Sequence, residues 1–267
     1  MAVFTQGTPC WVDAQLPDLE AGRRFYGELF GWTFGPGRDD ALAADALLDG
    51  ARVAGLLAKH DGRMPTTWTV HLATRDAVAL AARIEAAGGQ LVMAPYPVGR
   101  SGVRALAADP GGAVFGLRQP GDGAGDDGFE AVNRPGAFCW MEVYTRVPEA
   151  VDTFYATVFG WLGRQADPAA EGRDGAFDYR VWSPPGSRPG DDSAFGGRAL
   201  MTGAFPAELP GHVLPYFAVR DCDTACATTA RLGGRVATPP FDTPHGRIAV
   251  LHDNQGARFA VLAEPAA

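Results

Sequence analysis

The sequence of 267 residues has little positive charge, few cysteines and no long apolar segment. Its 31 acidic residues outnumber 23 basic ones, and Lys59 is the single lysine. The net charge of −8 excludes a basic surface for nucleic acid or anionic lipid. Four cysteines do not make a disulfide framework in a chain of this length. No apolar run reaches the roughly 18 residues that span a bilayer, and no signal peptide is visible, so we expect a cytoplasmic protein.

The chain contains an internal repeat. The motif Trp-Val-Asp, Phe-Tyr, Phe-Gly-Trp that starts at Trp11 returns as Trp-Met-Glu, Phe-Tyr, Phe-Gly-Trp from Trp140, at a constant offset of 129 residues. A Gly-Gly pair and an Asp-x-x-Gly-Ala-x-Phe turn recur later in each copy, at offsets of 145 and 144. We therefore predict a first domain at 1–120, a Gly/Asp-rich linker at 121–135 and a second domain at 136–267. The extra residues of the second copy are placed in 163–197, as a long loop or lid.

Each copy shows the order strand, helix and three strands twice. The helices of the first copy are predicted to begin at the capping residues Asp18 and Asp76 and to end at Gly31 and Gly88. Their counterparts span about 148–159 and 221–232. The strands that apolar alternation indicates most clearly are 10–15, 68–74, 103–107, 113–118, 138–144, 214–220, 248–252 and 258–263. The chain should thus consist of four βαβββ modules.

Together these motifs resemble the vicinal oxygen chelate superfamily in its tandem glyoxalase/bleomycin resistance/dioxygenase form. The resemblance covers essentially the whole chain and implies an α+β fold. Two domains built from four βαβββ modules would have curved mixed sheets that enclose concave cavities. The resemblance does not imply one reaction, because the superfamily contains glyoxalases, dioxygenases, epimerases, thiol transferases and binding proteins without activity.

Most enzymes of this superfamily bind a divalent metal, and the resemblance implies where its ligands would lie. The ligand positions on the first strand, the later strand and the final strand of the two copies fall on Trp11 and Trp140, Thr69 and Leu214, and Gly116 and Ala260. Such ions need imidazole and carboxylate ligands, which these positions lack. We therefore expect no metal and no other cofactor. The weaker alternative is a divalent metal at an off-pattern site made from Asp13 or Glu142 and the histidines His71, His212, His245 and His252.

Strand alternation places a carboxylate, Asp13 or Glu142, two residues after each first-strand tryptophan and on the same face. A carboxylate held beside indole and away from water suits a general base next to a carbonyl group. We predict Asp13 and Glu142 as bases, with His71 and Tyr144 as catalytic hydrogen-bonding groups. The residues predicted to bind substrate are Trp11, Gln15, Trp140, Tyr216, Arg258, His245 and Arg100.

The sequence leaves the pairing of the four modules open. Cavities form either from the two modules of one copy, or from the first with the fourth and the second with the third. In the first arrangement Asp13 shares a cavity with His71, and Glu142 with Tyr216 and Arg258. In the second arrangement these partners exchange.

The predicted function is a metal-independent lyase, isomerase or tailoring enzyme that acts on a small carbonyl-bearing or aromatic metabolite in an aromatic-lined cavity. The alternative is a resistance-type protein that sequesters a planar compound without turnover. A metal-dependent glyoxalase or dioxygenase with unusual ligands is a third reading. The expected partner is a small-molecule ligand or substrate, and not nucleic acid or a membrane. Because a tandem chain supplies both domains that single-domain relatives obtain by dimerising, we expect a monomer, with a homodimer as the alternative.

Overall fold

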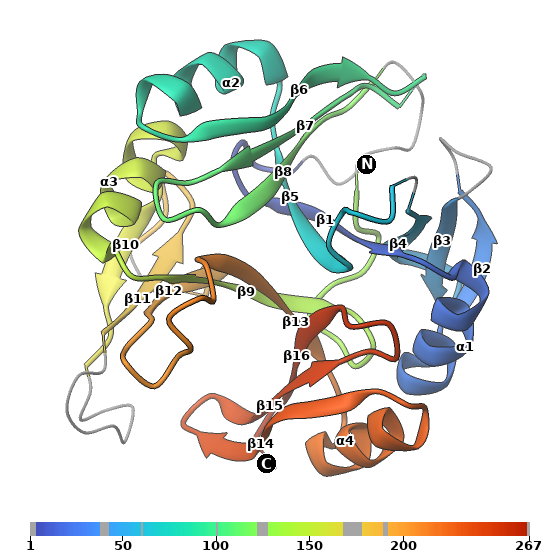
Figure 1. Cartoon of the computed structure of the whole chain (residues 1–267). Coiled ribbons are helices and arrows are strands. Elements are labelled where there is room, and N and C mark those ends of the chain that lie inside the picture. Colours follow the sequence, from blue (N-terminus) through green and yellow to red (C-terminus); the bar gives the residue numbers. More distant parts are fainter. Residues whose placement is uncertain are drawn as a thin grey trace. The chain divides into compact units, whose positions relative to one another are not determined.

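The computed structural model describes residues 4–37, 43–59, 61–99, 101–121, 128–167, 178–188 and 192–265. These residues form four helices and sixteen strands in four consecutive βαβββ modules (Figure 1). The helices are α1 (Leu19–Phe30), α2 (Ala77–Ala86), α3 (Pro148–Phe159) and α4 (Cys222–Arg231). The strands are β1 (Pro9–Leu16), β2 (Thr33–Pro36), β3 (Ala43–Leu48), β4 (Ala51–Ala58), β5 (Thr67–Ala73), β6 (Gln90–Pro97), β7 (Val103–Ala108), β8 (Val114–Gln119), β9 (Phe138–Thr145), β10 (Leu162–Gln165), β11 (Tyr179–Ser183), β12 (Gly196–Leu200), β13 (His212–Ala218), β14 (Arg235–Thr243), β15 (Gly246–His252) and β16 (Arg258–Ala263). The predicted fold class and module order are confirmed.

The strands form two mixed eight-stranded sheets. The first has the order β2-β3-β4-β1-β5-β8-β7-β6 and the second the order β10-β11-β12-β9-β13-β16-β15-β14. Within a module the first strand pairs in parallel with the last, as β1 does with β4 and β9 with β12. The hairpin partners, such as β11 and β12, are antiparallel. The strand that carries each predicted base therefore lies beside the last strand of its own module.

Local sequence signals explain the helix ends. The side chains of Asp18 and Asp76 each accept a 2.9 Å hydrogen bond from the amide three residues further on. Gly31 ends α1 with a φ of 74°, a left-handed conformation that glycine adopts without steric cost. Helix α3 has no capping side chain and begins at Pro148, whose missing N–H costs nothing in the first turn. The predicted helix boundaries hold within one or two residues.

The chain groups into two compact units. Unit 1 comprises Met1–Cys10, Val70–Asp127 and Met141–Val213, and unit 2 comprises Trp11–Thr69, Gly128–Trp140 and Leu214–Ala267. Unit 1 thus combines the second and third modules, and unit 2 the first and fourth. Each hydrogen-bonded sheet consists of the two modules of one copy, whereas each compact unit combines one module from each copy. In unit 1, α2 contacts α3, and in unit 2, α1 contacts α4 (Figure 1).

The repeated motifs form the core of each unit. In unit 2 the Tyr26 hydroxyl donates a 2.8 Å hydrogen bond to Asp253 and accepts one of 2.9 Å from Nε1 of Trp68. Their environment is aromatic, because Tyr26 also packs against Phe25, Phe30, Trp32 and Phe259. In unit 1 the corresponding Tyr155 packs against Phe115, Phe154, Phe159, Trp161 and Trp182. The Phe-Tyr and Phe-Gly-Trp motifs are therefore folding signals, since each buried aromatic side chain contributes about 2–3 kcal/mol.

Two predicted connections differ from expectation. The stretch 163–197, in which the extra residues of the second copy are predicted to form a loop or lid, also holds most of β10, the whole of β11 and the start of β12. Residues 168–177 and 189–191 of the stretch lie outside the described residues. Within the predicted linker, Phe129 is only 5% exposed and is part of the core of unit 2. The domain boundaries themselves stay a prediction.

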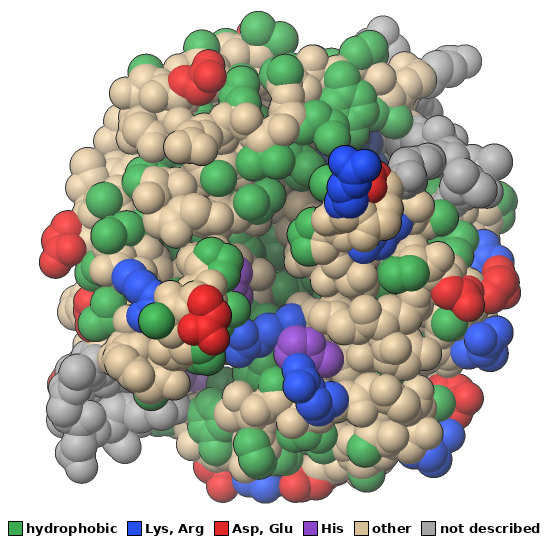
Figure 2. Space-filling view, viewed as in Figure 1, with side chains coloured by type: hydrophobic (Ala, Val, Ile, Leu, Met, Phe, Trp, Pro, Cys, Tyr) green, Lys and Arg blue, Asp and Glu red, His purple; other side chains and the backbone are tan. Residues whose placement is uncertain are grey.

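The surface carries charges of both signs. Acidic and basic side chains are interspersed on the face shown in Figure 2 rather than gathered by sign. In the part of the chain that the structure describes, no helix is long and apolar enough to cross a bilayer.

Candidate functional site

The two predicted bases occupy equivalent places in the two sheets. Asp13 on β1 is paired with Gly55 on β4, and Glu142 on β9 is paired with Gly197 on β12. Because paired residues of neighbouring strands point to the same face, each glycine leaves room beside a carboxylate. Different side chains fill this room in the two copies.

In unit 1, Glu142 is held by an aromatic pair. Glu142 is 9% exposed, and its Oε2 accepts a 2.7 Å hydrogen bond from the Tyr144 hydroxyl. The Tyr144 ring stacks on the imidazole of His212, with centroids 5.0 Å apart and planes inclined by 4°. Nδ1 of His212 lies 3.0 Å from the carbonyl oxygen of Pro210, which anchors the imidazole. The stack and the hydrogen bond together orient the carboxylate.

A further aromatic side chain, Tyr179 of β11, reaches the face of the sheet that carries Glu142. A Cβ atom at Gly197 would overlap the Tyr179 hydroxyl, which extends from β11. Tyr179 itself is half-buried. Tyr179 could not be found from the sequence, because it lies in the Gly-, Pro- and Asp-rich stretch where an inserted loop or lid is predicted.

In unit 2, an indole takes the equivalent place beside Asp13. A Cβ atom at Gly55 would lie 3.2 Å from Nε1 of Trp11 and 3.3 Å from Cβ of Asp13. Trp11 is only 4% exposed, and the Arg52 guanidinium lies 6.0 Å from the centre of its ring. The aromatic residue and the acid predicted for this site are therefore neighbours, and the indole is covered.

Residues of the predicted linker provide the cover. The Phe129 ring lies 5.8 Å from that of Trp11 and stacks on Phe138 at 5.1 Å. Glu130 accepts hydrogen bonds from the backbone N and from Nε of Arg52, at 2.9 and 3.1 Å. By contrast, Trp140 of the second copy is half-buried. Trp11 is thus packed within unit 2, and Trp140 is the more exposed of the two first-strand indoles.

The residues at the expected ligand positions do not fit a metal ion. Gly116 on β8 is paired with His71 on β5, and a Cβ atom at Gly116 would overlap the imidazole of His71. The space that a final-strand carboxylate would need is thus taken by a histidine that is 6% exposed. Across the described ranges, no group of three or more His, Cys, Asp or Glu side chains is placed to hold a metal.

Cys139 and Cys222 are poor candidates for a nucleophile. Burial, reinforced by the charge of Glu264, raises the pKa of the Cys139 thiol to about 12. Burial and the neighbouring Cys226 and Asp223 raise the pKa of Cys222 to about 12 as well. These thiols stay protonated at neutral pH and are poor nucleophiles.

The other predicted site residues are dispersed over several elements. Gln15 and Arg258 are half-buried, and Tyr216 is 3% exposed. His245 is exposed in the turn between β14 and β15, where its amide donates a 3.2 Å hydrogen bond to Thr243. Arg100 lies outside the described residues. Of the predicted residues, the structure brings together Glu142 with Tyr144, and Trp11 with Asp13.

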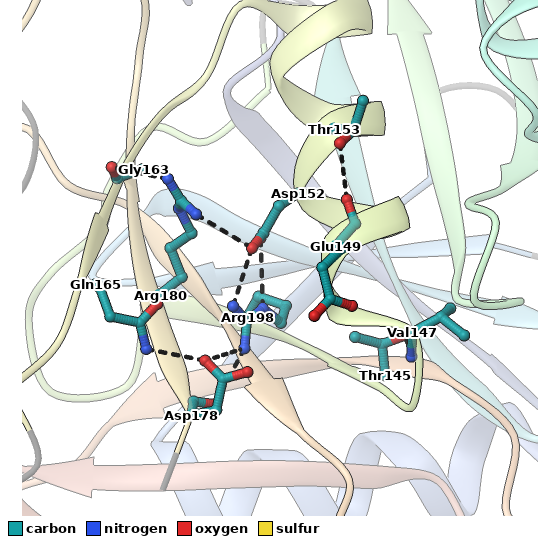
Figure 3. Close-up of polar contacts among 10 residues, drawn as sticks. All are labelled: Thr145, Val147, Glu149, Asp152, Thr153, Gly163, Gln165, Asp178, Arg180 and Arg198. Carbon is teal, nitrogen blue, oxygen red and sulfur yellow. Dashed lines mark hydrogen bonds and ion pairs between the residues drawn. The ribbon is translucent and has the colours of Figure 1, made fainter.

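A charged network fixes the opposite side of β11 and β12 to α3 (Figure 3). Arg198 of β12 is 2% exposed and donates hydrogen bonds of 2.9 and 3.3 Å to Asp152 of α3, and its Nη1 lies 2.7 Å from Asp178. Arg180 of β11 lies 3.4 Å from the same Asp152 carboxylate.

Burial alone would lower the pKa of Arg198, but the bonds to Asp152 and Asp178 outweigh it and raise that pKa. Burial likewise opposes ionisation of Asp178, yet the hydrogen bonds from Arg198 and Gln165 lower its pKa. The network therefore stays charged at neutral pH and holds both strands in place.

Comparisons with known proteins agree with the fold. A family model described as a glyoxalase-like domain matches residues 11–118. The Mycobacterium tuberculosis protein named "Putative glyoxylase CFP32" is 35% identical, over 97% of this chain and 95% of that protein. The Streptomyces peucetius protein named "Anthracycline biosynthesis protein DnrV" is 36% identical, over 98% of this chain and 95% of that protein.

Solved structures share the same architecture. The Mn(II)-bound glyoxalase from Novosphingobium aromaticivorans superposes with a TM-score of 0.61 at 17% identity, covering 98% of this chain and 84% of that one. Solved 2,3-dioxygenases also share the fold. At this level of identity the likeness concerns the fold alone.

Proposed function

The chain belongs to the vicinal oxygen chelate superfamily as a glyoxalase-like protein, and from this membership we propose that it is an enzyme acting on a small carbonyl-bearing or aromatic metabolite. In this proposal Glu142 removes a proton from the carbon next to a carbonyl group. This step is shared by isomerases, lyases and many tailoring enzymes. No metal ion takes part.

The observation that carries the proposal is the 2.7 Å hydrogen bond from Tyr144 to Glu142. A general base must be held in one orientation within reach of the proton that it removes. As Glu142 takes the proton, the C–H electron pair forms the new C=C bond and the carbonyl oxygen gains negative charge. Return of the proton to another carbon completes an isomerisation and restores the carboxylate.

The names of the relatives support this substrate class. One is named a glyoxylase and another an anthracycline biosynthesis protein. Anthracyclines are planar aromatic compounds that bear carbonyl groups. A stacked pair such as Tyr144 and His212 offers a flat ring surface next to the carboxylate, which suits a planar substrate.

Sequestration without turnover is the second candidate function. The parallel stack of Tyr144 on His212 favours it, because a flat aromatic surface can hold a planar compound without reacting with it. In that case Trp140, the half-buried indole two residues before Glu142, would contribute affinity, and the carboxylate would not be needed.

Exchange of carbon-bound hydrogen for deuterium tests the proposal. The protein is incubated in D₂O with 1-indanone, 2-tetralone or dihydroxyacetone, and exchange next to the carbonyl is followed by proton NMR. The wild type should exchange at least one compound, and Glu142→Gln should lose about 100-fold or more in rate. Glu149→Gln, an exposed glutamate of α3, is the matched control and should behave as wild type.

Other results would contradict the proposal. Equal exchange rates for the wild type and Glu142→Gln would show that Glu142 is not the base. Quenching of tryptophan emission by these compounds without exchange, abolished in Trp140→Ala, would support sequestration instead.

A further inference from the structure

Tyr179 lies on the face of the sheet that carries Glu142. In the β9–β12 ladder Glu142 is paired with Gly197, and in the β11–β12 ladder Tyr179 is paired with Ala199. The phenol reaches diagonally over Gly197, where its hydroxyl takes the space that a side chain there would need.

The neighbouring arginines give independent support for this orientation. Arg180 and Arg198 follow Tyr179 and Gly197 in sequence, and both bind Asp152 of α3 (Figure 3). Successive side chains of a strand point to opposite faces. Because the arginines point toward α3, Tyr179 and Gly197 point to the other face, toward the side chain of Glu142.

Two phenols, on strands at either side of β12, therefore lie on the face of the sheet that carries the carboxylate. Tyr144 approaches along β9 and donates its hydrogen bond to Oε2 of Glu142. Tyr179 approaches across β12, from the side opposite β9 in the ladder. The Tyr179 hydroxyl lies over Gly197, the residue paired with Glu142, so a substrate carbonyl group bound beside the carboxylate would be near this phenol.

We propose that Tyr179 is the catalytic acid of this site, a role that rests on the proposed function of Glu142. As Glu142 takes the proton from carbon, the carbonyl oxygen takes the proton of the Tyr179 hydroxyl, giving an enol, a phenolate and a neutral Glu142. When Glu142 returns its proton to carbon, the enol proton returns to Tyr179. Both residues end in their starting state, and no other reactant is consumed.

Gly197 belongs to this arrangement. Its backbone does not need a positive φ, so its lack of a side chain is explained by the space that the Tyr179 phenol and the backbone carbonyl oxygen of Arg180 occupy. Glycine at this position thus keeps the phenol beside the carboxylate.

The deuterium-exchange assay at saturating ketone tests the inference, with 1-indanone, 2-tetralone and dihydroxyacetone as probes. Tyr179→Phe should lower the exchange rate about 100-fold and change ligand affinity by less than about threefold, because the donor acts on charge that develops in the transition state. Tyr96→Phe, a phenol of β6 that is 41% exposed, is the matched control. Gly197→Ala keeps the Tyr179 hydroxyl but displaces it, so a folded Gly197→Ala protein should show a similar loss.

The outcomes separate the two claims. Exchange that is lost in Glu142→Gln and reduced about 100-fold in Tyr179→Phe supports the inference. Exchange lost in Glu142→Gln but unchanged in Tyr179→Phe overturns the role of Tyr179 and leaves the proposed function intact. Absence of exchange in the wild type overturns both.

Discussion

The Tyr144 hydroxyl donates a 2.7 Å hydrogen bond to Oε2 of Glu142, and the ring that carries this hydroxyl stacks in parallel on His212. The bond joins two residues of one strand, and the stack joins that strand to the beginning of β13. In the proposed function, this positioning prepares the carboxylate for proton transfer before any ligand arrives.

Removal of the Tyr144 hydroxyl tests this positioning. Tyr144→Phe keeps the stack on His212 but removes the hydrogen bond that orients the carboxylate, so the exchange rate should fall about tenfold with little change in affinity. The rate at saturating ketone and the fluorescence-derived dissociation constant are measured side by side. A variant with the wild-type rate would show that Glu142 is oriented by other contacts.

Restoring a carboxylate at the final-strand position should not restore metal binding. In Gly116→Glu the new side chain collides with the imidazole of His71, and we expect the free energy of unfolding to fall by about 2 kcal/mol or more. His71→Ala in the same chain should recover part of that loss. Urea denaturation and elemental analysis measure both effects. Stoichiometric metal in a fully stable Gly116→Glu protein would contradict the fit argued above.

Asp109 should make stability depend on pH. It is 3% exposed, and burial raises its pKa to about 6, although the amides of Ala113 and Gly111 work in the opposite direction. The folded state therefore binds this proton more tightly than the unfolded chain, where the pKa is about 4. The resulting stabilisation, up to about 3 kcal/mol, is present below pH 4 and lost as the pH rises to 6.

Asp109→Asn removes this titration while its side-chain oxygen can still accept the turn amides. The free energy of unfolding, measured in urea at pH 4, 5 and 6, should lose most of its decline with pH in this variant. An unchanged slope would assign the pH dependence to other groups.

The charged network that joins α3 to β11 and β12 predicts that replacing Asp152 lowers the free energy of unfolding. Asp152→Asn leaves the Arg198 guanidinium buried with one of its two carboxylate partners, which should cost about 2–3 kcal/mol of unfolding free energy. Asp49→Asn, whose carboxylate is 82% exposed beside Arg134, is the control and should change little. Equal midpoints in urea for the two variants would show that the network contributes no net stability.

Much of the fold could be predicted because its signals are local. Asp18, Gly31 and the Asp-x-x-Gly turns set the ends of elements through their own backbone contacts. The pairing of modules could not be predicted, because it depends on which copy of the Phe-Tyr motif meets which copy of the Asp turn. Tyr26 bonds to Asp253, 227 residues away, and nothing local in the sequence specifies that choice.

The site could be predicted only along single strands. Alternation on β9 placed Glu142 and Tyr144 on one face, and they are hydrogen-bonded. Tyr179 lies on a strand inside a Gly- and Asp-rich segment whose composition is typical of loops, so no periodic pattern marked it. Phe129 and Glu130 were missed for the same reason, because a polar and glycine-rich stretch precedes them.

The most direct test of the account is the deuterium-exchange rate of chelator-treated wild-type protein compared with chelator-treated Glu142→Gln. We predict that the wild type retains its full exchange rate after removal of metal ions and that Glu142→Gln loses about 100-fold. If exchange disappears with the chelator and is restored by one equivalent of a divalent metal, the reaction depends on a metal ion and the account is contradicted.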